Sequence, residues 1–570
     1  MSYLNNLDFS IIALYLVLIF ILGIYFTNKA SNSVEDFFIG GRTMPWWLLG
    51  VSMAATNFSI DTPIAVTRFV ASEGIGGVWF MWSSAISAIM VTFFFSRLWR
   101  RSKVITDAEI IEKRYSGNSA KYLRLFKGVY FGIIFNAFIM GWVFLSLTKV
   151  MAGITSVDIN YILWPTVILV FIYSVASGFY GVVITDFLQY FIALFGSIIL
   201  AYLSVQHVGG IDSLITGLQG ESGDAPSLLN FFPSFEDNSL LPLSVFMIYI
   251  LMQWWAHKYS DGGGKHIQRI LSAKSENDAF KGSALFTVLT YIFQIWPWII
   301  TALCGVLVFQ GIGDPEMIYP KMMVEVLPHG LLGLVVVGLV GAFMSTIDTH
   351  LNLGGSYIVN DIYKRFIVKD QTTKHYILVS RISMGVLLII AVIISKNLDS
   401  VAGAWKFLLT FASGAGLTWI IRWFWWRANA WTEISGMIAS GVTASYIHYF
   451  RPEWLYSSKL FVTVSISTVT WLIVTFATKP VQKETLVEFV KLVRPGIWGW
   501  KNIYQSTDLQ PHNFLSDGLK LSALAIAAFF SFNFGIGYLI LRNGWIGIAL
   551  ISVGCLIGFK ILRVKQNYPK

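Results

Sequence analysis

The sequence predicts an all-α polytopic membrane protein with about 15 transmembrane helices, because one long apolar segment follows another along the chain. Hydrophobic residues make up 55% of the 570 residues, and charged residues only 13%. Soluble globular proteins are less apolar and carry roughly 25% charged residues. The mean hydropathy of +0.65 points the same way. We therefore expect most of the chain to lie in lipid.

Each long apolar window is a candidate helix, since the hydrocarbon core of a bilayer needs roughly 20 apolar residues per span. The windows lie near 9–27, 45–71, 76–96, 125–155, 159–177, 180–205, 241–257, 282–310, 330–360, 375–395, 402–421, 433–449, 458–477, 520–541 and 544–562. The first window has no basic segment before it and no cleavage pattern after it, so we interpret it as a retained helix.

Basic residues predict the orientation, because Lys and Arg concentrate on the cytoplasmic side of membrane proteins. Most of the 41 Lys and Arg residues fall on alternate connections, which become cytoplasmic if the N-terminus is outside. The connection 206–240 contains five acidic residues and no Lys or Arg, as expected of an outer loop. We predict a multi-pass protein of the cell membrane with its N-terminus outside and its C-terminus in the cytoplasm.

Several classes of function have no support in the sequence. The net charge of +10 follows from the membrane topology, so we expect no nucleic-acid partner. The chain has no Walker loop, no HExxH helix and no Gly-x-Ser-x-Gly elbow, and its two cysteines lie in apolar windows. We therefore expect neither an enzyme nor an ATP-driven pump, and we expect no organic cofactor.

The window 330–360 is interrupted by polar residues between Ala342 and Asn352. The spacing of Ala342, Ser345, Thr349 and Asn352 places them on one face of a helix, and Thr346 adds a second hydroxyl beside Ser345. Hydroxyl, carbonyl and amide oxygens suit a hard cation. Alternatively, the hydroxyls bond back to carbonyls of their own helix, and the glycines on either side permit close helix packing.

Asp348 lies within the same polar interruption and is harder to explain by packing. A carboxylate in the middle of a membrane helix costs roughly 2.5–3.5 kcal/mol on insertion scales, and such residues mark ion or proton pathways. Together with the neighbouring hydroxyls, Asp348 indicates transport of an ion across the membrane.

A second interruption lies in the window 45–71. Asn57, Ser59, Asp61 and Thr62 stand close together just before Pro63. Proline removes a backbone donor, so carbonyl oxygens near this point become available to a cation or a solute. The alternative is a simple proline kink in a continuous helix.

The chain from Trp254 to Gly264 is a third interruption, where an apolar window ends in polar residues and three consecutive glycines. Transporters often carry such broken helices at corresponding positions of two inverted repeats. We divide the chain accordingly: an extra helix at 1–30, repeats at 45–205 and 241–427, and peripheral helices at 430–570 with a cytoplasmic connection near 478–518.

Taken together, these segments resemble the solute:sodium symporter family, which has the five-plus-five inverted repeat of LeuT-like transporters. The residues that carry the resemblance are Asp36 to Arg42, the run 55–59, Thr185 to Gln189, Gln268-Arg269 and Ala342 to Asn352. The resemblance covers about residues 9–480. It implies a LeuT-like core with discontinuous helices.

The resemblance also implies ion-binding residues. The sodium site common to the family matches backbone carbonyls of Ala55 and Phe58 and, on the later helix, Ala342, Ser345 and Thr346. Some members hold a second cation near an acid that matches Asp186. The adjoining positions in this chain are Asp348 and Thr349, so this second site would take either a cation or a shared proton.

The expected substrate pocket departs from that of sugar-carrying relatives. Where those relatives have an acid and a lysine, this chain has Met81 and Thr290. The residues that we expect to contact the substrate are Asn57, Asp61, Thr62, Trp82, Ser84 and Gln294. Arg68 either binds a substrate carboxylate or extends to the outer headgroups beside Glu73, and we favour the second.

The sequence and the resemblance together predict sodium-coupled symport of a small organic solute, such as a sugar, amino acid or carboxylate, into the cell by alternating access. Sodium, the solute and the lipid bilayer are the expected partners, and a monomer is expected to suffice. Two alternatives remain open: a proton-coupled carrier that uses Asp186 and Asp348, and a membrane sensor that keeps the fold without transporting.

Overall fold

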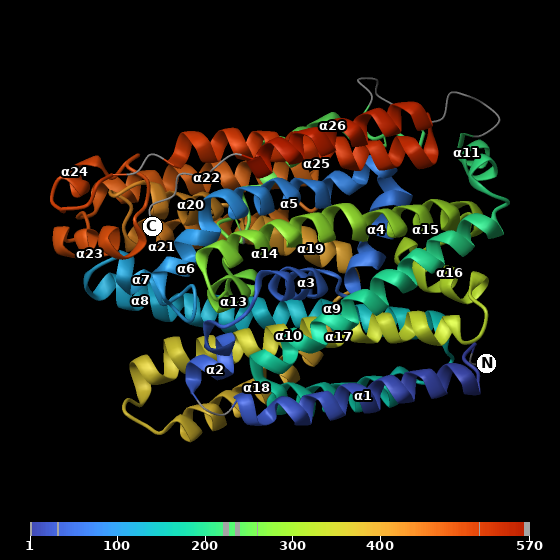
Figure 1. Ribbon diagram of the computed structural model, residues 1–570, viewed down its shortest axis with the longest axis horizontal. Coiled ribbons are helices and arrows are strands. Elements are labelled where there is room, and N and C mark those ends of the chain that lie inside the picture. Colours follow the sequence, from blue (N-terminus) through green and yellow to red (C-terminus); the bar gives the residue numbers. More distant parts are fainter. Residues whose placement is uncertain are drawn as a thin grey trace.

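Long helices run side by side along a common axis in the computed structural model of the protein (Figure 1). The structure describes residues 3–30, 33–219, 227–233, 240–258, 260–511 and 514–563. Among these residues, the pairing of β type is limited to one bridge between Met44 and Ala273. The predicted all-α fold is confirmed.

The α-helices are listed here in chain order. They are α1 (Asn6–Ala30), α2 (Val34–Ile39), α3 (Trp46–Asn57), α4 (Asp61–Glu73), α5 (Trp79–Met90), α6 (Ser96–Ser102), α7 (Ile110–Arg114), α8 (Gly117–Val129), α9 (Asn136–Ile154), α10 (Ile159–His207), α11 (Ile211–Gln219), α12 (Leu243–Ile248), α13 (Lys265–Ser272), α14 (Glu276–Val288), α15 (Ile295–Val308), α16 (Ile318–Val326), α17 (Leu331–Ser356), α18 (Thr373–Ser395), α19 (Val401–Ser413), α20 (Gly416–Phe424), α21 (Ala430–Phe450), α22 (Tyr456–Ala477), α23 (Lys483–Val493), α24 (Lys501–Tyr504), α25 (Phe514–Leu541) and α26 (Gly544–Arg563).

Short π-helical segments interrupt or extend several of these helices. In the described part of the chain they are Val91–Phe95, Tyr130–Phe135, Tyr249–Gln253, Leu289–Gln294 and Tyr357–Ile367. Such segments shift the helical phase and often occur at functional sites.

The number of complete spans differs from the expected fifteen. Within the described residues, nine helices are long and apolar enough to cross a membrane, or ten if the bent pair α19 and α20 counts as one span. Every predicted window does contain helix. The count falls because breaks divide some windows into helices too short to qualify, such as α3 and α4 with 12 and 13 residues.

The first break lies at residues 58–60, between α3 and α4. Pro63 is the third residue of α4, where a missing N–H removes no bond within the helix. The backbone N–H of Phe58 donates to the carbonyl oxygens of Ala54 and Ala55, at 2.9 and 3.1 Å. The predicted interruption is therefore a true break before the proline, and the alternative of a kinked continuous helix is wrong.

The second break separates the π-helical segment that ends at Gln253 from α13. Gly262 and Gly264 have φ angles of +85° and +67°, a backbone region that favours glycine. The backbone N–H of Gly264 donates to Asp107 Oδ2 at 3.0 Å, which anchors the start of α13. The chain from Trp254 to Gly264 thus interrupts the helix, as the sequence predicts.

The helix that contains the polar interruption, α17, lies in the centre of the bundle. It packs against α10, α3, α1 and α9, and most of its residues are buried. Gly338 permits this contact, because a Cβ atom there would lie 2.9 Å from the Cα of Ala193. Gly341, Gly354 and Gly355 also face close neighbours, so close packing does account for these glycines.

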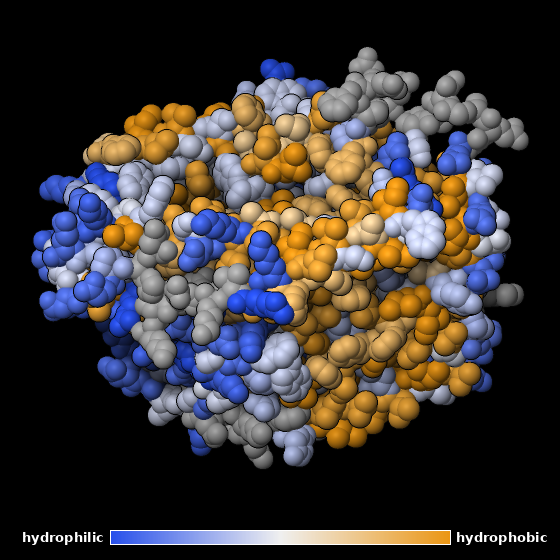
Figure 2. Space-filling model, turned by 45° about the horizontal axis from the view of Figure 1, so that its top comes forward, coloured by the Kyte–Doolittle hydropathy of each residue, from blue (hydrophilic) through white to orange (hydrophobic). Residues whose placement is uncertain are grey.

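The surface shows an apolar band between two polar ends. On the face that Figure 2 shows, hydrophobic residues cover the middle and hydrophilic residues lie at both ends. The hydrophilic residues are densest at the end that carries α7, α8, α23 and α24. Large apolar side chains such as Ile473, Phe476 and Leu556 are 64–70% exposed. Such an exposed apolar belt is typical of a multi-pass membrane protein.

Candidate functional site

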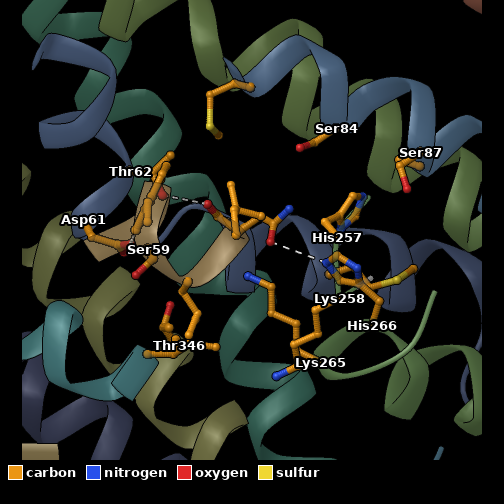
Figure 3. Close-up of a pocket in the computed structure, with 18 of the residues that line it drawn as sticks. Ser59, Asp61, Thr62, Ser84, Ser87, His257, Lys258, Lys265, His266 and Thr346 are labelled. Carbon is orange, nitrogen blue, oxygen red and sulfur yellow. Dashed lines mark hydrogen bonds between the residues drawn. The ribbon is translucent and has the colours of Figure 1, made fainter. Parts of the chain in front are cut away.

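A cavity of about 210 Å³ lies beside both breaks (Figure 3). Its polar lining comes from α3, α4, α5, both breaks, α13, α14, α17 and the π-helical segment at Leu289–Gln294. These lining residues are Asn57, Ser59, Asp61, Thr62, Ser84, Ser87, His257, Lys258, Lys265, His266, Ser283, Tyr291, Thr346 and His350. Phe80, Phe135, Trp142, Phe286 and Trp405 add aromatic surface.

Four of the six expected substrate residues line this cavity: Asn57, Asp61, Thr62 and Ser84. The Thr62 hydroxyl donates to the carbonyl oxygen of Asn57 at 3.0 Å, across the first break. The indole N–H of Trp405 donates to Asp61 Oδ2 at 3.0 Å, so α19 lies over the start of α4. The break thus presents both polar side chains and backbone to the cavity.

The other two expected residues, Trp82 and Gln294, lie outside the lining. Trp82 is fully buried against Phe231 and other aromatic rings. Two residues correspond to about 200° of rotation on an α-helix, so Trp82 and Ser84 cannot share a face. Gln294 closes a π-helical segment that shifts the helical phase, and its amide donates to the carbonyl oxygen of Ala54 at 3.0 Å.

The five lysine and histidine residues of the lining were not expected from the sequence. His257 and Lys258 lie in the second break, Lys265 and His266 begin α13, and His350 lies on α17. The imidazole Nε2 of His266 lies 3.4 Å from Asn57 Oδ1, which connects the two breaks across the cavity. The glycine run in the sequence predicted this break. The basic residues beside that run are the sequence feature that could have predicted the cavity wall.

The residues proposed for the first sodium site lie where α17 meets the end of α3. The Thr346 hydroxyl donates to the carbonyl oxygen of Ala342 at 3.0 Å and approaches that of Thr56 at 3.3 Å. Ala55 precedes Thr56 near the end of α3, and Phe58 is the first residue of the break. The Ser345 hydroxyl instead donates to Asp186 Oδ1 at 2.6 Å.

Asp186 belongs to a buried ion pair with Arg269, whose Nη2 lies 3.1 Å from Asp186 Oδ2. The same Nη2 donates to the Thr349 hydroxyl at 2.7 Å. The Ser52 hydroxyl donates to Asp186 Oδ2 at 2.5 Å. Two residues of the expected second site, Asp186 and Thr349, are therefore close together, with a guanidinium group between them.

Asp348 has a different partner from Asp186. Its Oδ1 accepts a hydrogen bond from the Ser174 hydroxyl on the first half of α10. Its side chain is 1% exposed, so this carboxyl group lies deep between α10 and α17. The two acids that the sequence analysis grouped together thus have separate hydrogen-bond partners.

Arg68 contacts two acidic residues that the sequence analysis did not connect with it. Its guanidinium lies 3.6 Å from Asp314 and 4.0 Å from Glu316, in the connection before α16. Glu73, the expected neighbour, pairs with Lys406 at 3.2 Å. The contacts of Arg68 were not predicted, because Asp314 and Glu316 are distant in the sequence and reach Arg68 only in the folded chain.

Asp314 is held by Lys149 at the same end of the bundle, with 2.8 Å between Lys149 Nζ and Asp314 Oδ2. Burial alone raises the pKa of Asp314, but the hydrogen bond from Lys149 and nearby positive charges outweigh burial and lower the pKa below its usual value. Charged contacts thus join α4, α9 and the connection before α16 at this end of the bundle.

Comparison with known proteins gives a consistent result. The model of the sodium:solute symporter family matches residues 37–440. The sodium/glucose cotransporter of Vibrio parahaemolyticus is 25% identical over 495 residues, which cover 80% of this chain and 88% of that protein. The osmoregulated proline transporter OpuE of Bacillus subtilis is 24% identical over 448 residues, which cover 76% of this chain and 87% of that protein.

A solved structure of a Na⁺-coupled sialic acid symporter, in a substrate-bound outward-open state, has the same fold. Its TM-score is 0.71 with 19% identity, and the match covers 84% of this chain and 99% of that chain. At this identity the likeness shows the fold. The family model, by contrast, covers well over half of the 570 residues, and this chain therefore belongs to the sodium:solute symporter family.

Proposed function

We propose that this protein is a secondary active transporter that couples inward movement of sodium to uptake of a small organic solute. Family membership supports sodium-coupled symport of a small solute. The observation that carries the proposal is the position of Thr346, which lines the cavity and also contacts the carbonyl oxygens of Ala342 and Thr56. One side chain therefore touches both the candidate ion site and the candidate substrate site.

For the ion, we propose the carbonyl oxygens of Ala55, Phe58 and Ala342 with the hydroxyls of Ser345 and Thr346. A sodium ion there would join the end of α3 to α17 and so favour the arrangement that completes the cavity. Each charge that enters contributes roughly 2.3 kcal/mol per 100 mV of membrane potential, in addition to its concentration gradient. One ion per cycle would therefore support substantial accumulation of the solute.

Asp186 and Thr349 support a second cation less directly, because the guanidinium of Arg269 contacts both. Asp348 is the better candidate for a proton, since its described partner is the Ser174 hydroxyl and no ion pair forms to it among the described residues. Proton coupling through Asp348 is thus the second candidate function.

For the solute, the names of the relatives suggest sugars or proline, but the cavity does not resemble a sugar pocket. Met81 lines the cavity at the position where sugar-carrying relatives are expected to have an acid. Thr290 occupies the position of their expected lysine. We propose Asn57, Asp61, Thr62 and Ser84 as substrate contacts, because their side chains line the cavity.

For topology, we propose that α7, α8, α23 and α24 lie at the cytoplasmic end. These helices share the end of the bundle opposite the start of α1, and their connections are rich in Lys and Arg (Figure 1). The N-terminus would then be outside. The two breaks support repeats at 45–205 and 241–427, with 1–30 and 430–570 as peripheral helices.

Uptake by the purified protein in liposomes tests this function, with radiolabelled solutes drawn from sugars, amino acids and carboxylates. We expect accumulation under an inward sodium gradient and none in sodium-free buffer with an inward proton gradient. Transport that is unchanged without sodium would exclude the sodium proposal and favour proton coupling through Asp348.

Replacing Thr346 by Ala is expected to weaken the apparent affinity for sodium about tenfold or more, because the candidate site loses a hydroxyl oxygen. Stabilisation of the purified protein against heat, measured as sodium is added, gives this affinity without requiring a known solute. Thr463→Ala is a matched control, since this buried hydroxyl on α22 donates to the carbonyl oxygen of Lys459 on its own helix and lies outside the cavity lining. Equal sodium affinity in the two variants would exclude Thr346 as a ligand.

A further inference from the structure

The carbonyl oxygens at the end of α3 have partners of different kinds. The last four carbonyl groups of a helix have no N–H partner within that helix, so they bond to groups from elsewhere. The carbonyl oxygen of Ala54 accepts a hydrogen bond from the Gln294 amide at 3.0 Å. The carbonyl oxygen of Thr56 instead lies 3.4 Å from the ammonium nitrogen of Lys265. One carbonyl oxygen at the first break therefore faces a positive charge.

Lys265 reaches this carbonyl oxygen from the second break. It is the first residue of α13, where the partial positive charge of a helix N-terminus disfavours a cation. Its side chain extends to the opposite kind of helix end, because the last carbonyl groups of α3 carry partial negative charge. The distance of 3.4 Å is longer than the roughly 2.7–2.9 Å of a charge-assisted hydrogen bond. Lys265 is half-buried and lines the cavity, so its ammonium group has space to move.

The proposed sodium ligands surround the same carbonyl oxygen. The Thr346 hydroxyl lies 3.3 Å from the carbonyl oxygen of Thr56, and Ala55 directly precedes Thr56 in α3. Figure 3 shows Thr346 and Lys265 in the same part of the cavity. In transporters, the carbonyl ends of half-helices coordinate the driving ion. A sodium ion and an ammonium group at this end would repel each other, because like charges a few ångströms apart interact strongly where little water is present.

Asp61 offers the ammonium group of Lys265 a second partner. Asp61 is 3% exposed and lines the cavity, and its charge opposes that of Lys265. Its Oδ2 accepts a hydrogen bond from the Trp405 indole at 3.0 Å. Its Oδ1 has no hydrogen-bond partner among the described residues, which is costly for a buried acceptor. A lysine that leaves the end of α3 would therefore find a buried carboxylate oxygen in the same cavity.

We propose that the ammonium group of Lys265 is a tethered cation, which holds the carbonyl end of α3 before sodium binds and which sodium displaces toward Asp61 Oδ1. This inference rests on the proposed function as a sodium symporter and adds a step to it. The displaced ammonium group pairs with one of the proposed substrate contacts, so ion binding changes the charge pattern of the cavity. Lys265 is thus a positioning residue that connects the ion site to the solute site.

Replacing Lys265 by Met is expected to strengthen sodium binding about tenfold or more, because sodium then has no ammonium group to displace. Methionine keeps an unbranched side chain of similar length. The affinity is measured from the melting temperature of the purified full-length protein as sodium replaces potassium at constant ionic strength. A lysine with only a structural role would not oppose sodium, so weaker or unchanged sodium binding in Lys265→Met would overturn the proposal.

Two further variants distinguish this contact from a general loss of positive charge. Lys258 lines the same cavity but lies over the rings of Phe131 and Phe135, at 4.9 and 5.2 Å from their centroids. Lys258→Met should therefore strengthen sodium binding by less than about threefold. Lys265→Arg keeps the charge and should bind sodium no more tightly than the unchanged protein. Equal strengthening in Lys258→Met and Lys265→Met would assign the effect to net charge and overturn the proposal.

A double-mutant cycle tests the second partner. Asp61→Asn should weaken sodium binding about fivefold or more, because the displaced ammonium group of Lys265 then has no carboxylate to pair with. In protein that already carries Lys265→Met, the same substitution should change sodium affinity by less than about twofold. Equal weakening in both backgrounds would show that Asp61 acts on sodium directly, and displacement of Lys265 toward Asp61 would be wrong.

The sodium titrations also separate this inference from the proposed function. If sodium stabilises the unchanged protein and Lys265→Met binds it no more tightly, the tethered cation is wrong and sodium symport stands. If sodium stabilises Lys265→Met alone, the lysine does hold the ion site, and the proposed coupling of the unchanged protein to sodium is wrong. If sodium stabilises neither protein, both proposals are overturned.

Discussion

Replacing Arg269 by Gln is expected to destabilise the folded protein by about 3–5 kcal/mol, because a buried carboxylate then loses its cation. Arg269 and Asp186 are 1% and 0% exposed, and their closest atoms lie 3.1 Å apart. The glutamine amide keeps a hydrogen-bond donor but not the charge. A lower melting temperature of the purified protein in detergent, together with a lower yield of folded protein, measures the effect.

A double-mutant cycle with Asp186→Asn isolates the ion pair. The variant with both substitutions should recover most of the stability, because neither a carboxylate nor a guanidinium is then left unpaired. Arg451→Gln is the control, since Arg451 is exposed at the end of α21 and should change stability by less than about 0.5 kcal/mol. Losses that simply add in the double variant would show that the pair does not act as a unit.

The ion pair between Arg269 and Asp186 is also expected to affect the coupling of sodium to uptake. Asp186 accepts a hydrogen bond from Ser345, which is one of the proposed sodium ligands, and Arg269 donates to Thr349 on the same helix. A cycle that restores stability should therefore fail to restore sodium-dependent uptake, because the hydroxyl of Ser345 loses its charged partner. We therefore expect that the double variant at Arg269 and Asp186 separates the stability of the protein from its transport activity.

The broken helices could be predicted from the sequence because their causes are local. Gly262 and Gly264 allow the left-handed backbone just before α13, and Thr62 supplies a hydrogen bond to the backbone carbonyl of Asn57 across the first break. The hydroxyl face of α17 is also local, since it follows from spacing alone. The number of spans was harder to predict from the sequence, because a break shortens a helix without changing the average hydropathy of the segment.

The partners of charged residues could not be predicted, because the contacts join distant parts of the chain. Nothing in the sequence near Arg68 indicates that it reaches Asp314, and Arg269 meets Asp186 from another helix. The basic wall of the cavity was missed for a related reason. Residues such as Lys258 lie in non-helical chain, where spacing does not tell which way a side chain points.

Replacing Arg422 by Met is the second variant for which we expect a loss of about 3–5 kcal/mol, because it removes a cation from a buried network at the second break. Arg422 Nη2 lies 2.5 Å from Asp261 Oδ2, and Trp423 donates its indole N–H to the same oxygen at 2.9 Å. Glu433 lies 3.6 Å from Arg422 Nη1 and retains Lys127 at 2.7 Å. The substitution therefore leaves Asp261 as the carboxylate without a cation.

Asp261 is the residue through which this network holds the second break in place, so the rescue experiment differs from that at Arg269. Asp261→Asn combined with Arg422→Met should recover both the melting temperature and sodium-dependent uptake, because the amide still accepts from Trp423 and neither residue lines the cavity. The Arg269 pair should recover stability alone. If the Arg422 pair also regains stability without uptake, the network takes part in transport itself and is more than an anchor for the break.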